Sequence, residues 1–228
     1  MKLRCYRSII GLCFLCACTA PYGNEEKNLP MQVAEAYGFD HMEQVESIQY
    51  TWNVQVDSAA VATRDWRWDL RSDEVYYSGP DTSLVYSLSE TDTALNAIDS
   101  RFVNDKYWLL FPFQLAWDTG YEFEVIPDQT APISGENTTK LIILYNDTDG
   151  YTPGDAYDLY LDEDNRIIEW MFRRDNGESG RAMTWENVQD YQGIKIAQDH
   201  RDKEGNKIIW FTNIGINKED VPPWPREY

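Results

Sequence analysis

The strongest nucleophiles in the sequence are the thiols of four cysteines, and all four lie within the first 18 residues. They are Cys5, Cys13, Cys16 and Cys18. A thiol can carry a lipid, pair in a disulfide or bind a soft metal ion. Because no cysteine follows residue 18, the rest of the sequence offers neither a disulfide framework nor a thiolate metal site. Cysteine chemistry in this protein therefore concerns the N-terminus.

The N-terminal segment has the features of a signal peptide. Basic residues precede the apolar run 9–15 (IIGLCFL), which is roughly half the length that spans a bilayer. Residues 15–18 (LCAC) resemble the bacterial lipoprotein signal, in which cleavage falls just before a cysteine that is lipidated. This resemblance implies a signal peptide over 1–17, a lipid on Cys18, a flexible tether over 18–30 and, with Thr19 after the cysteine, outer-membrane sorting. An ordinary secretory signal is the alternative.

The two histidines, His41 and His200, are the next candidates for catalysis or metal binding. Neither has a second histidine at ligand spacing, and the charged residues around His200 favour a solvated hairpin end. No Gly-x-Ser-x-Gly, phosphate-loop or Gly-x-Gly-x-x-Gly motif occurs. We therefore expect no catalytic residue, no metal and no cofactor.

The acidic loop 146–150 (NDTDG) invites comparison with a calcium site. An EF-hand alignment fails, because the positions of the first and last carboxylate ligands hold Tyr145 and Ala156. Asn, Asp and Gly also form turns through local hydrogen bonds, and a plain turn is the favoured interpretation. A different calcium site stays open as an alternative; it would use Asp147, Asp149, Asp155 and Asp158.

Composition limits the classes of partner and the number of domains. The formal net charge of the 228-residue chain is −19, and such an acidic surface repels phosphate backbones, so we expect no nucleic-acid partner. An apolar content of 43%, with 14% aromatic residues, is typical of a folded protein rather than a disordered one. The length after the tether suits one domain over 31–228.

The body of the sequence alternates apolar and polar residues, which predicts antiparallel strands. In the clearest strand the residues of one face are Ile48, Tyr50, Trp52, Val54 and Val56. Strands are expected over 48–56, 66–71, 74–78, 121–125, 141–145, 157–161, 167–172, 184–188, 194–199 and 208–216. Helices are expected over 31–37 and 91–102, and Pro112 limits any helix in the apolar run 107–117. The predicted class is α+β, mainly β: a single curved antiparallel sheet (half-open β-barrel, about 9–11 strands) with helices on its concave face.

Three stretches give the body a family resemblance: 66–69 (WRWD), 104–113 (NDKYWLLFPF) and 154–160 (GDAYDLY). With the order of elements, they resemble outer-membrane lipoprotein-sorting-like proteins of the lipoprotein-carrier half-barrel superfamily, and most of all members from Bacteroidetes. The resemblance spans roughly residues 31–216. It implies a half-open barrel with an apolar interior and places segment 108–117 in or over the opening. Because this chain carries its own anchor, the anchored receptor of that superfamily is the closer analogue.

The apolar faces of the predicted strands and helices could line a cavity for an acyl chain or another hydrophobe, although each of these residues could instead pack a closed core. The candidate ligand-binding residues are Tyr50, Trp52, Val54, Trp66, Trp68, Trp108, Phe111 and Phe113. We expect a lipid-anchored outer-membrane or periplasmic protein that binds a hydrophobic or lipid-like ligand without catalysis. The alternatives are a glycan-binding surface lipoprotein and a non-catalytic subunit of an envelope complex. The sequence does not predict an oligomeric state.

Overall fold

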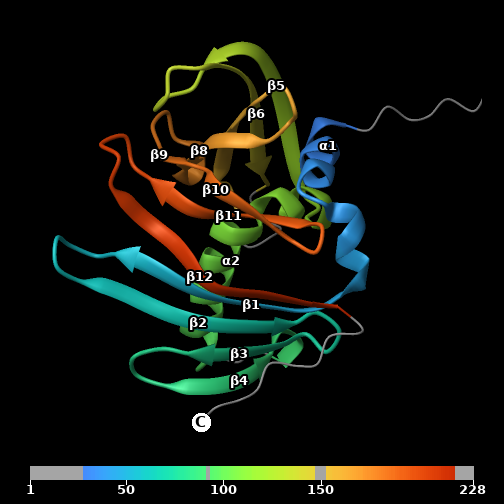
Figure 1. The fold of residues 1–228 in the computed structure, drawn as a ribbon, viewed down its shortest axis with the longest axis vertical. Helices are drawn as coiled ribbons and strands as arrows, with labels where there is room; N and C mark the ends of the chain where they lie inside the picture. Colours follow the sequence, from blue (N-terminus) through green and yellow to red (C-terminus); the bar gives the residue numbers. More distant parts are fainter. Residues whose placement is uncertain (1–27, 91–92, 147–152, 219–228) are drawn as a thin grey trace, which may run out of the picture.

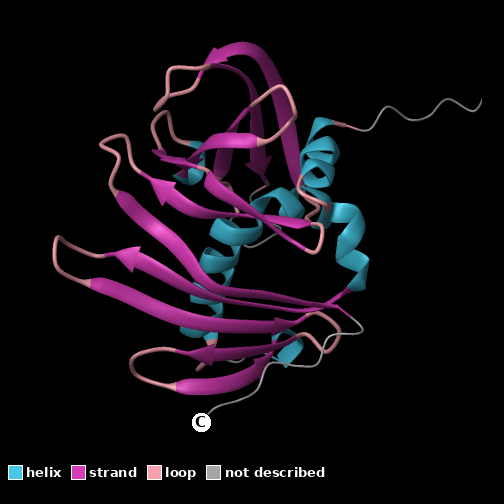
Figure 2. Ribbon diagram, in the orientation of Figure 1, coloured by secondary structure: helices cyan, strands magenta, loops and turns pink. Residues whose placement is uncertain are grey.

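The computed structural model describes residues 28–90, 93–146 and 153–218, which form two antiparallel sheets and a few helices (Figures 1 and 2). The predicted signal peptide and Cys18 lie outside these ranges. The helices are α1 (Leu29–Ala36), η1 (Phe39–Gln44), η2 (Leu88–Glu90), α2 (Asn96–Trp117) and η3 (Arg174–Asn176). The strands are β1 (Val45–Gln55), β2 (Val61–Asp69), β3 (Glu74–Ser78), β4 (Ser83–Ser87), β5 (Tyr121–Thr130), β6 (Asn137–Tyr145), β7 (Ala156–Leu161), β8 (Ile167–Arg173), β9 (Arg181–Thr184), β10 (Glu186–Tyr191), β11 (Ile194–Arg201) and β12 (Lys207–Lys218).

The strands form a seven-stranded sheet in the order β10-β11-β12-β1-β2-β3-β4 and a five-stranded sheet in the order β5-β6-β7-β8-β9. The chain passes from one sheet to the other between β9 and β10, which only Trp185 separates. At this seam Arg201 of β11 donates its backbone N–H to the Thr184 hydroxyl at 2.9 Å. The two sheets therefore meet along β9 and β11 through side-chain contacts, without a shared ladder.

The predicted fold class is confirmed: the protein is mainly β, its strand pairs are antiparallel, and its helices are few. The structure has two sheets in place of the predicted single sheet, because strand pairing is interrupted between β9 and β10, at Trp185. The sequence pattern over 184–188 predicts one strand, whereas this segment holds the end of β9 and the start of β10. The short strand β4 and the strand β9 have too few alternating residues to stand out in the sequence.

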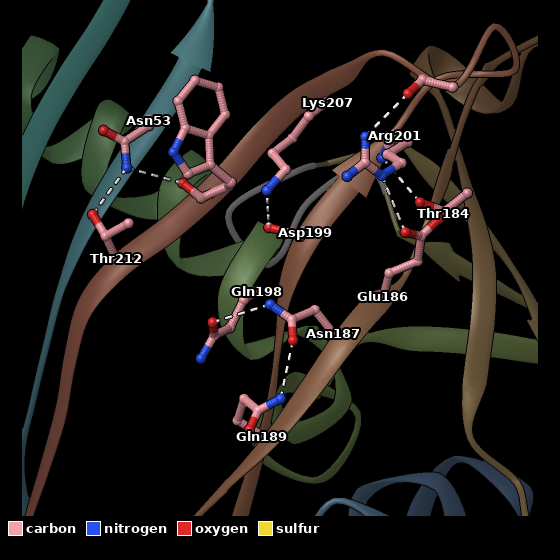
Figure 3. A network of polar contacts seen from close by, with 12 residues as sticks. Asn53, Thr184, Glu186, Asn187, Gln189, Gln198, Asp199, Arg201, Lys207 and Thr212 are labelled. Atoms are coloured by element: carbon pink, nitrogen blue, oxygen red, sulfur yellow. Dashed lines mark hydrogen bonds and ion pairs between the residues drawn. The ribbon is translucent and has the colours of Figure 1, made fainter.

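The seven-stranded sheet has an apolar inner face and a polar outer face, as alternation predicts. On the inner face Ile48, Tyr50 and Trp52 of β1 are buried, and Tyr50 packs edge-on against Phe211 of β12 with ring centroids 5.8 Å apart. On the outer face polar side chains pair across strands (Figure 3). There Asn53 bonds to the Thr212 hydroxyl at 3.2 Å and Lys207 to Asp199 at 2.9 Å. Cross-strand pairs of this kind fix the register of the sheet.

Helix α2 lies behind the seven-stranded sheet in the view of Figure 1 and supplies twelve buried residues to the core. It runs through the apolar segment in which Pro112 was expected to limit a helix. The proline distorts the helix two residues earlier, where the backbone of Leu110 leaves the helical region (φ −115°, ψ 17°). Proline has no N–H to donate and its ring crowds the preceding turn, which explains this irregularity. Among the helices described, none has both the length and the apolar character needed to cross a bilayer.

Both α-helices are tied to the sheets by buried polar groups. Asp118, at the C-terminal end of α2, accepts hydrogen bonds from the hydroxyls of Tyr107 at 2.7 Å and Tyr145 at 2.6 Å. Burial raises the pKa of both hydroxyls far above the usual range, so they remain donors. Helix α1 begins at Leu29, inside the predicted tether, with Asn28 as its N-cap. Tyr37 is the residue after the last residue of α1. Its hydroxyl donates to the Ile167 carbonyl of β8 and accepts from the Ile167 N–H.

Candidate ligand-binding site

A pocket of about 540 Å³ lies between helix α2 and the inner faces of both sheets. We call it the inter-sheet pocket. Its apolar walls are formed by Trp52, Val54, Val103, Tyr107, Trp108, Tyr157, Trp170, Phe172 and Ile209. These side chains are buried or half-buried, and they come from β1, α2, β7, β8 and β12. A concave, mostly aromatic pocket of this size is typical of small-molecule sites.

The rim of the inter-sheet pocket is polar. It is formed by Asp99, Ser100, Asn104, Asp155, Arg174 and Arg181. All six side chains are exposed or half-exposed, in contrast to the walls. The pocket therefore joins an apolar interior to a charged entrance, which suits a ligand with a hydrophobic part and a polar part.

The structure brings some of the predicted ligand-binding residues together and separates others. Trp52, Val54 and Trp108 line the inter-sheet pocket. Trp68 lines a different hollow beside Trp117, and Tyr50 and Trp66 border a hollow toward β3 and β4. Phe111 and Phe113 are fully buried in the core. Strand and helix periodicity gives the face of a residue, but it does not show which element packs opposite.

Several wall and rim residues are not among the ligand-binding candidates chosen from the sequence. Tyr157, Trp170 and Phe172 lie on the inner faces of β7 and β8, which alternation does predict. The rim residues Arg174 and Arg181 carried no such signal, because an exposed arginine near a strand end is ordinary in sequence terms.

A buried ion pair anchors α2 beside the pocket. Asp105, which is fully buried, accepts two hydrogen bonds from the Arg64 guanidinium of β2, at 2.6 and 2.7 Å. It also accepts from the Trp66 indole at 2.8 Å and the Asn104 amide at 3.0 Å. Burial raises the pKa of the Asp105 carboxyl, and the hydrogen bonds and charge of Arg64 oppose this effect. The Arg64 guanidinium also lies 3.8 Å from the ring centroid of Trp52.

His200 occupies the seam between the two sheets, and the expectation of a solvated histidine is wrong. Its side chain is fully buried, because β11 turns His200 inward. The neighbouring residues point to the outer face, where Asp199 pairs with Lys207 and Arg201 pairs with Glu186. The Nδ1 atom lies 3.0 Å from the Thr184 carbonyl, so this nitrogen carries the proton. The ring packs against Trp108, Trp185 and Phe211, with centroids 4.6–5.9 Å apart.

Burial lowers the pKa of His200 to about 4, so its imidazole is neutral at pH 7. The Thr184 carbonyl, the Asp199 charge and the Trp108 carbonyl partly offset this effect. The Trp108 carbonyl is available because Pro112, four residues later, has no N–H to give it. The irregularity of α2 thus places a polar group of the pocket wall beside the seam.

Hydroxyl and indole groups contribute polar atoms to the lining of the inter-sheet pocket. Ser100 is its only serine, and its hydroxyl donates to the Asn96 carbonyl at 2.7 Å instead of to a base. Within the part of the chain that the structure describes, no group of three acidic, histidine or cysteine side chains could hold a metal ion. The buried indole N–H groups of Trp52 and Trp170 have no partner among the described residues. Both are donors that a ligand oxygen or a water molecule could satisfy.

The acidic loop considered for calcium is partly described. Asp147 and Asp149 lie outside the described residues. Asp158 is buried and is neutralised by Arg173, at 3.0 Å, and by Lys140, at 2.7 Å. Asp155 accepts a hydrogen bond from the backbone of Asp175 at 2.9 Å. Because its charge is already paired with two cations, Asp158 is excluded as a calcium ligand.

Comparisons with known proteins add little to this geometry. No family model matches the chain, and no curated protein matches it. Among solved structures, it is similar to a DUF1329 family protein from Desulfovibrio piger, with 10% identity and a TM-score of 0.49. That match covers 85% of this chain and 95% of the other. A likeness this distant carries no argument about family or ligand, and what is established is a mainly β protein of two antiparallel sheets.

Proposed function

We propose that this protein binds a hydrophobic or lipid-like ligand in the inter-sheet pocket, without transforming it, while a lipid on Cys18 holds it at the outer membrane. The observation that supports this proposal is the aromatic-walled pocket of about 540 Å³ between α2 and the two sheets. Pockets that bury most of a small ligand have volumes of roughly 300–1,000 Å³. The lipid anchor rests on the sequence motif at 15–18.

The surface of the described residues favours this function over glycan binding. A glycan-binding face needs a row of exposed aromatic rings that can stack on sugars. In the ranges described, Phe123 is the one aromatic side chain that is exposed, and the other large exposed apolar residues are valines. Most aromatic side chains of the described residues instead lie in the core or in the pocket walls.

Native mass spectrometry of residues 19–228, purified from cells without detergent, tests the proposed function. We expect a reproducible added mass that organic extraction removes and that is identified as a lipid or another hydrophobe. A bare protein mass that stays bare after incubation with membrane lipids would contradict the proposal.

Filling the pocket is expected to weaken binding. Val54 lies at the end of β1 and lines the inter-sheet pocket, so a Val54→Trp side chain occupies space that a ligand needs. We expect dodecanol to bind at least about tenfold more weakly by calorimetry, a loss of about 1.4 kcal/mol or more. Val56→Trp is the matched control, because Val56 is 64% exposed and does not line the pocket. Equal affinities for the two variants would place the ligand elsewhere.

Replacing the lipidated thiol is expected to release the protein from the membrane. Cys18→Ser removes the nucleophile that accepts the lipid, whereas Cys16→Ser leaves it in place. We expect labelled palmitate to be incorporated into the wild type and Cys16→Ser but not into Cys18→Ser. Absence of label from all three proteins would support the secretory-signal alternative instead.

A further inference from the structure

Two arginines stand on one side of the pocket rim, where the chain passes from β8 to β9. Arg181 is paired across the ladder with Phe172, a residue of the pocket wall. Arg174 follows β8 directly and begins η3. Both side chains are exposed, and neither guanidinium forms an ion pair or hydrogen bond within the described residues. Within the ranges described, both are therefore cations without an ion-pair partner at the entrance of an apolar pocket.

The backbone holds both arginines in place. The Arg173 guanidinium binds Asp158 on one side and, on the other, Asn176 at 2.6 Å and the Gly177 carbonyl at 2.9 Å, which fixes the turn carrying Arg174. Just before the strand that carries Arg181, Gly180 lies so close to β8 that a Cβ atom would be 2.3 Å from the Phe172 carbonyl oxygen. The fold therefore sets the backbone positions that carry the two arginines before any ligand arrives, which lowers part of the cost of binding.

The described carboxylates near the rim form no ion pair or hydrogen bond with these arginines. Asp155 accepts from the Asp175 backbone, and Asp99 accepts from the Tyr86 hydroxyl at 3.2 Å. Hydrogen bonds from Asn206 and Glu204 lower the pKa of the Asp202 carboxyl, and the charge of Arg181 adds to this effect. The oxygens of Asp202 accept these hydrogen bonds within its own turn, from Glu204 and Asn206. The two guanidinium groups thus keep their donors for another anion.

We propose that the inter-sheet pocket selects a single-chain amphiphile with an anionic head group, a carboxylate or a phosphate, which Arg174 and Arg181 bind at the rim. This inference rests on the proposed function and names its ligand class. The planar guanidinium fork matches both carboxylate and phosphate oxygens, and its charge-assisted hydrogen bonds are stronger than neutral ones. The pocket volume, about 540 Å³, suits one tail of moderate length.

The net charge of the chain makes such a preference diagnostic. A protein with a formal charge of −19 repels anions in general, so tighter binding of an anion than of its neutral counterpart requires a local positive site. Four probes with the same tail separate the contributions: dodecanoate, dodecyl phosphate, dodecanol and dodecyltrimethylammonium. Dodecanol measures the pocket, and the other three measure the head-group site.

Calorimetric titrations of these probes into the full-length protein test the inference. We expect one of the two anions to bind about tenfold more tightly than dodecanol, and the tighter anion identifies the head-group chemistry. In Arg174→Gln/Arg181→Gln that advantage is expected to disappear, so that the anions bind no more tightly than dodecanol. Arg166→Gln is the control for charge removal, because it takes one positive charge, half of that lost in the double variant, from an exposed residue of the β7–β8 turn away from the pocket.

A charge reversal strengthens the test. Arg174→Glu/Arg181→Glu is expected to bind dodecyltrimethylammonium more tightly than dodecanoate. The inference is overturned if wild type binds dodecanol as tightly as both anions, prefers the ammonium probe, or loses dodecanol and anion affinity equally in the glutamine variant. Those results leave the proposed function standing. If no probe binds to the wild type, the proposed function itself fails.

Discussion

Replacing Asp105 with alanine is expected to lower the free energy of unfolding by about 3 kcal/mol. The substitution leaves the Arg64 guanidinium without its counter-ion, and that side chain is only 17% exposed. It also removes the acceptor of the Trp66 indole N–H. Breaking a buried pair typically costs 3–5 kcal/mol, and the residual exposure of Arg64 places the effect at the lower end. Denaturant unfolding, followed by tryptophan fluorescence, measures it.

Two further variants separate the cost of an orphaned charge from the value of the pair. Asp164→Ala breaks the exposed pair with Arg166, and we expect a change of at most about 1 kcal/mol. Arg64→Met/Asp105→Leu replaces both charges with apolar side chains, and it should be less destabilised than Asp105→Ala. A cost below about 1 kcal/mol for Asp105→Ala would show that α2 does not depend on this anchor.

Acid is expected to destabilise the protein through His200 by about 3 kcal/mol between pH 7 and pH 4. The pKa of the folded chain, about 4, lies below the ordinary value of 6.5. At a pH between these two values, His200 is mostly protonated in the unfolded chain and mostly neutral in the folded chain. The contribution of neutral His200 is therefore complete above about pH 6.5 and is lost as the pH falls toward 4.

Comparing His200→Leu with wild type isolates this contribution from the titration of carboxylates. The free energy of unfolding should fall between pH 7 and pH 4 by about 3 kcal/mol less in His200→Leu than in wild type. His41→Leu is the control for replacing a histidine with leucine at an exposed position. An identical pH dependence in wild type and His200→Leu would contradict the burial of His200 at the seam.

Both predictions concern the walls of the inter-sheet pocket. Asp105 fixes the face of α2 that presents Val103 and Trp108, and His200 packs behind Trp108 where the two sheets meet. Loss of either contact should change the shape of the pocket as well as lower the free energy of unfolding. Affinity for dodecanol in these variants, measured where they remain folded, connects stability to the proposed function.

The sequence by itself determined the fold class and the inward faces of the strands. Alternation over Ile48, Tyr50 and Trp52 depends on a backbone period of two, which does not require knowledge of the partner strand. The candidate lipid site at Cys18 likewise depends on a short local motif. It stays a prediction, because residue 18 lies outside the described ranges.

Only the tertiary structure decided which of these residues form a pocket. Trp66 packs against Phe102 with centroids 5.4 Å apart, and Phe111 packs against Trp170 at 5.1 Å, so both fill the core. Trp52 and Trp108, chosen on the same sequence grounds, face the inter-sheet pocket. Local periodicity fixes the direction of a side chain, but packing depends on which distant element lies opposite.

The same reason explains the polar sites that the sequence did not reveal. Arg64 and Asp105 are 41 residues apart in the chain and meet because α2 crosses β2. His200 has charged neighbours in sequence, yet β11 turns it into the core beside Thr184. A single sequence carries no signal of such pairings, since each residue taken alone is compatible with a solvated surface. Their partners, and therefore their chemistry, exist only in the folded chain.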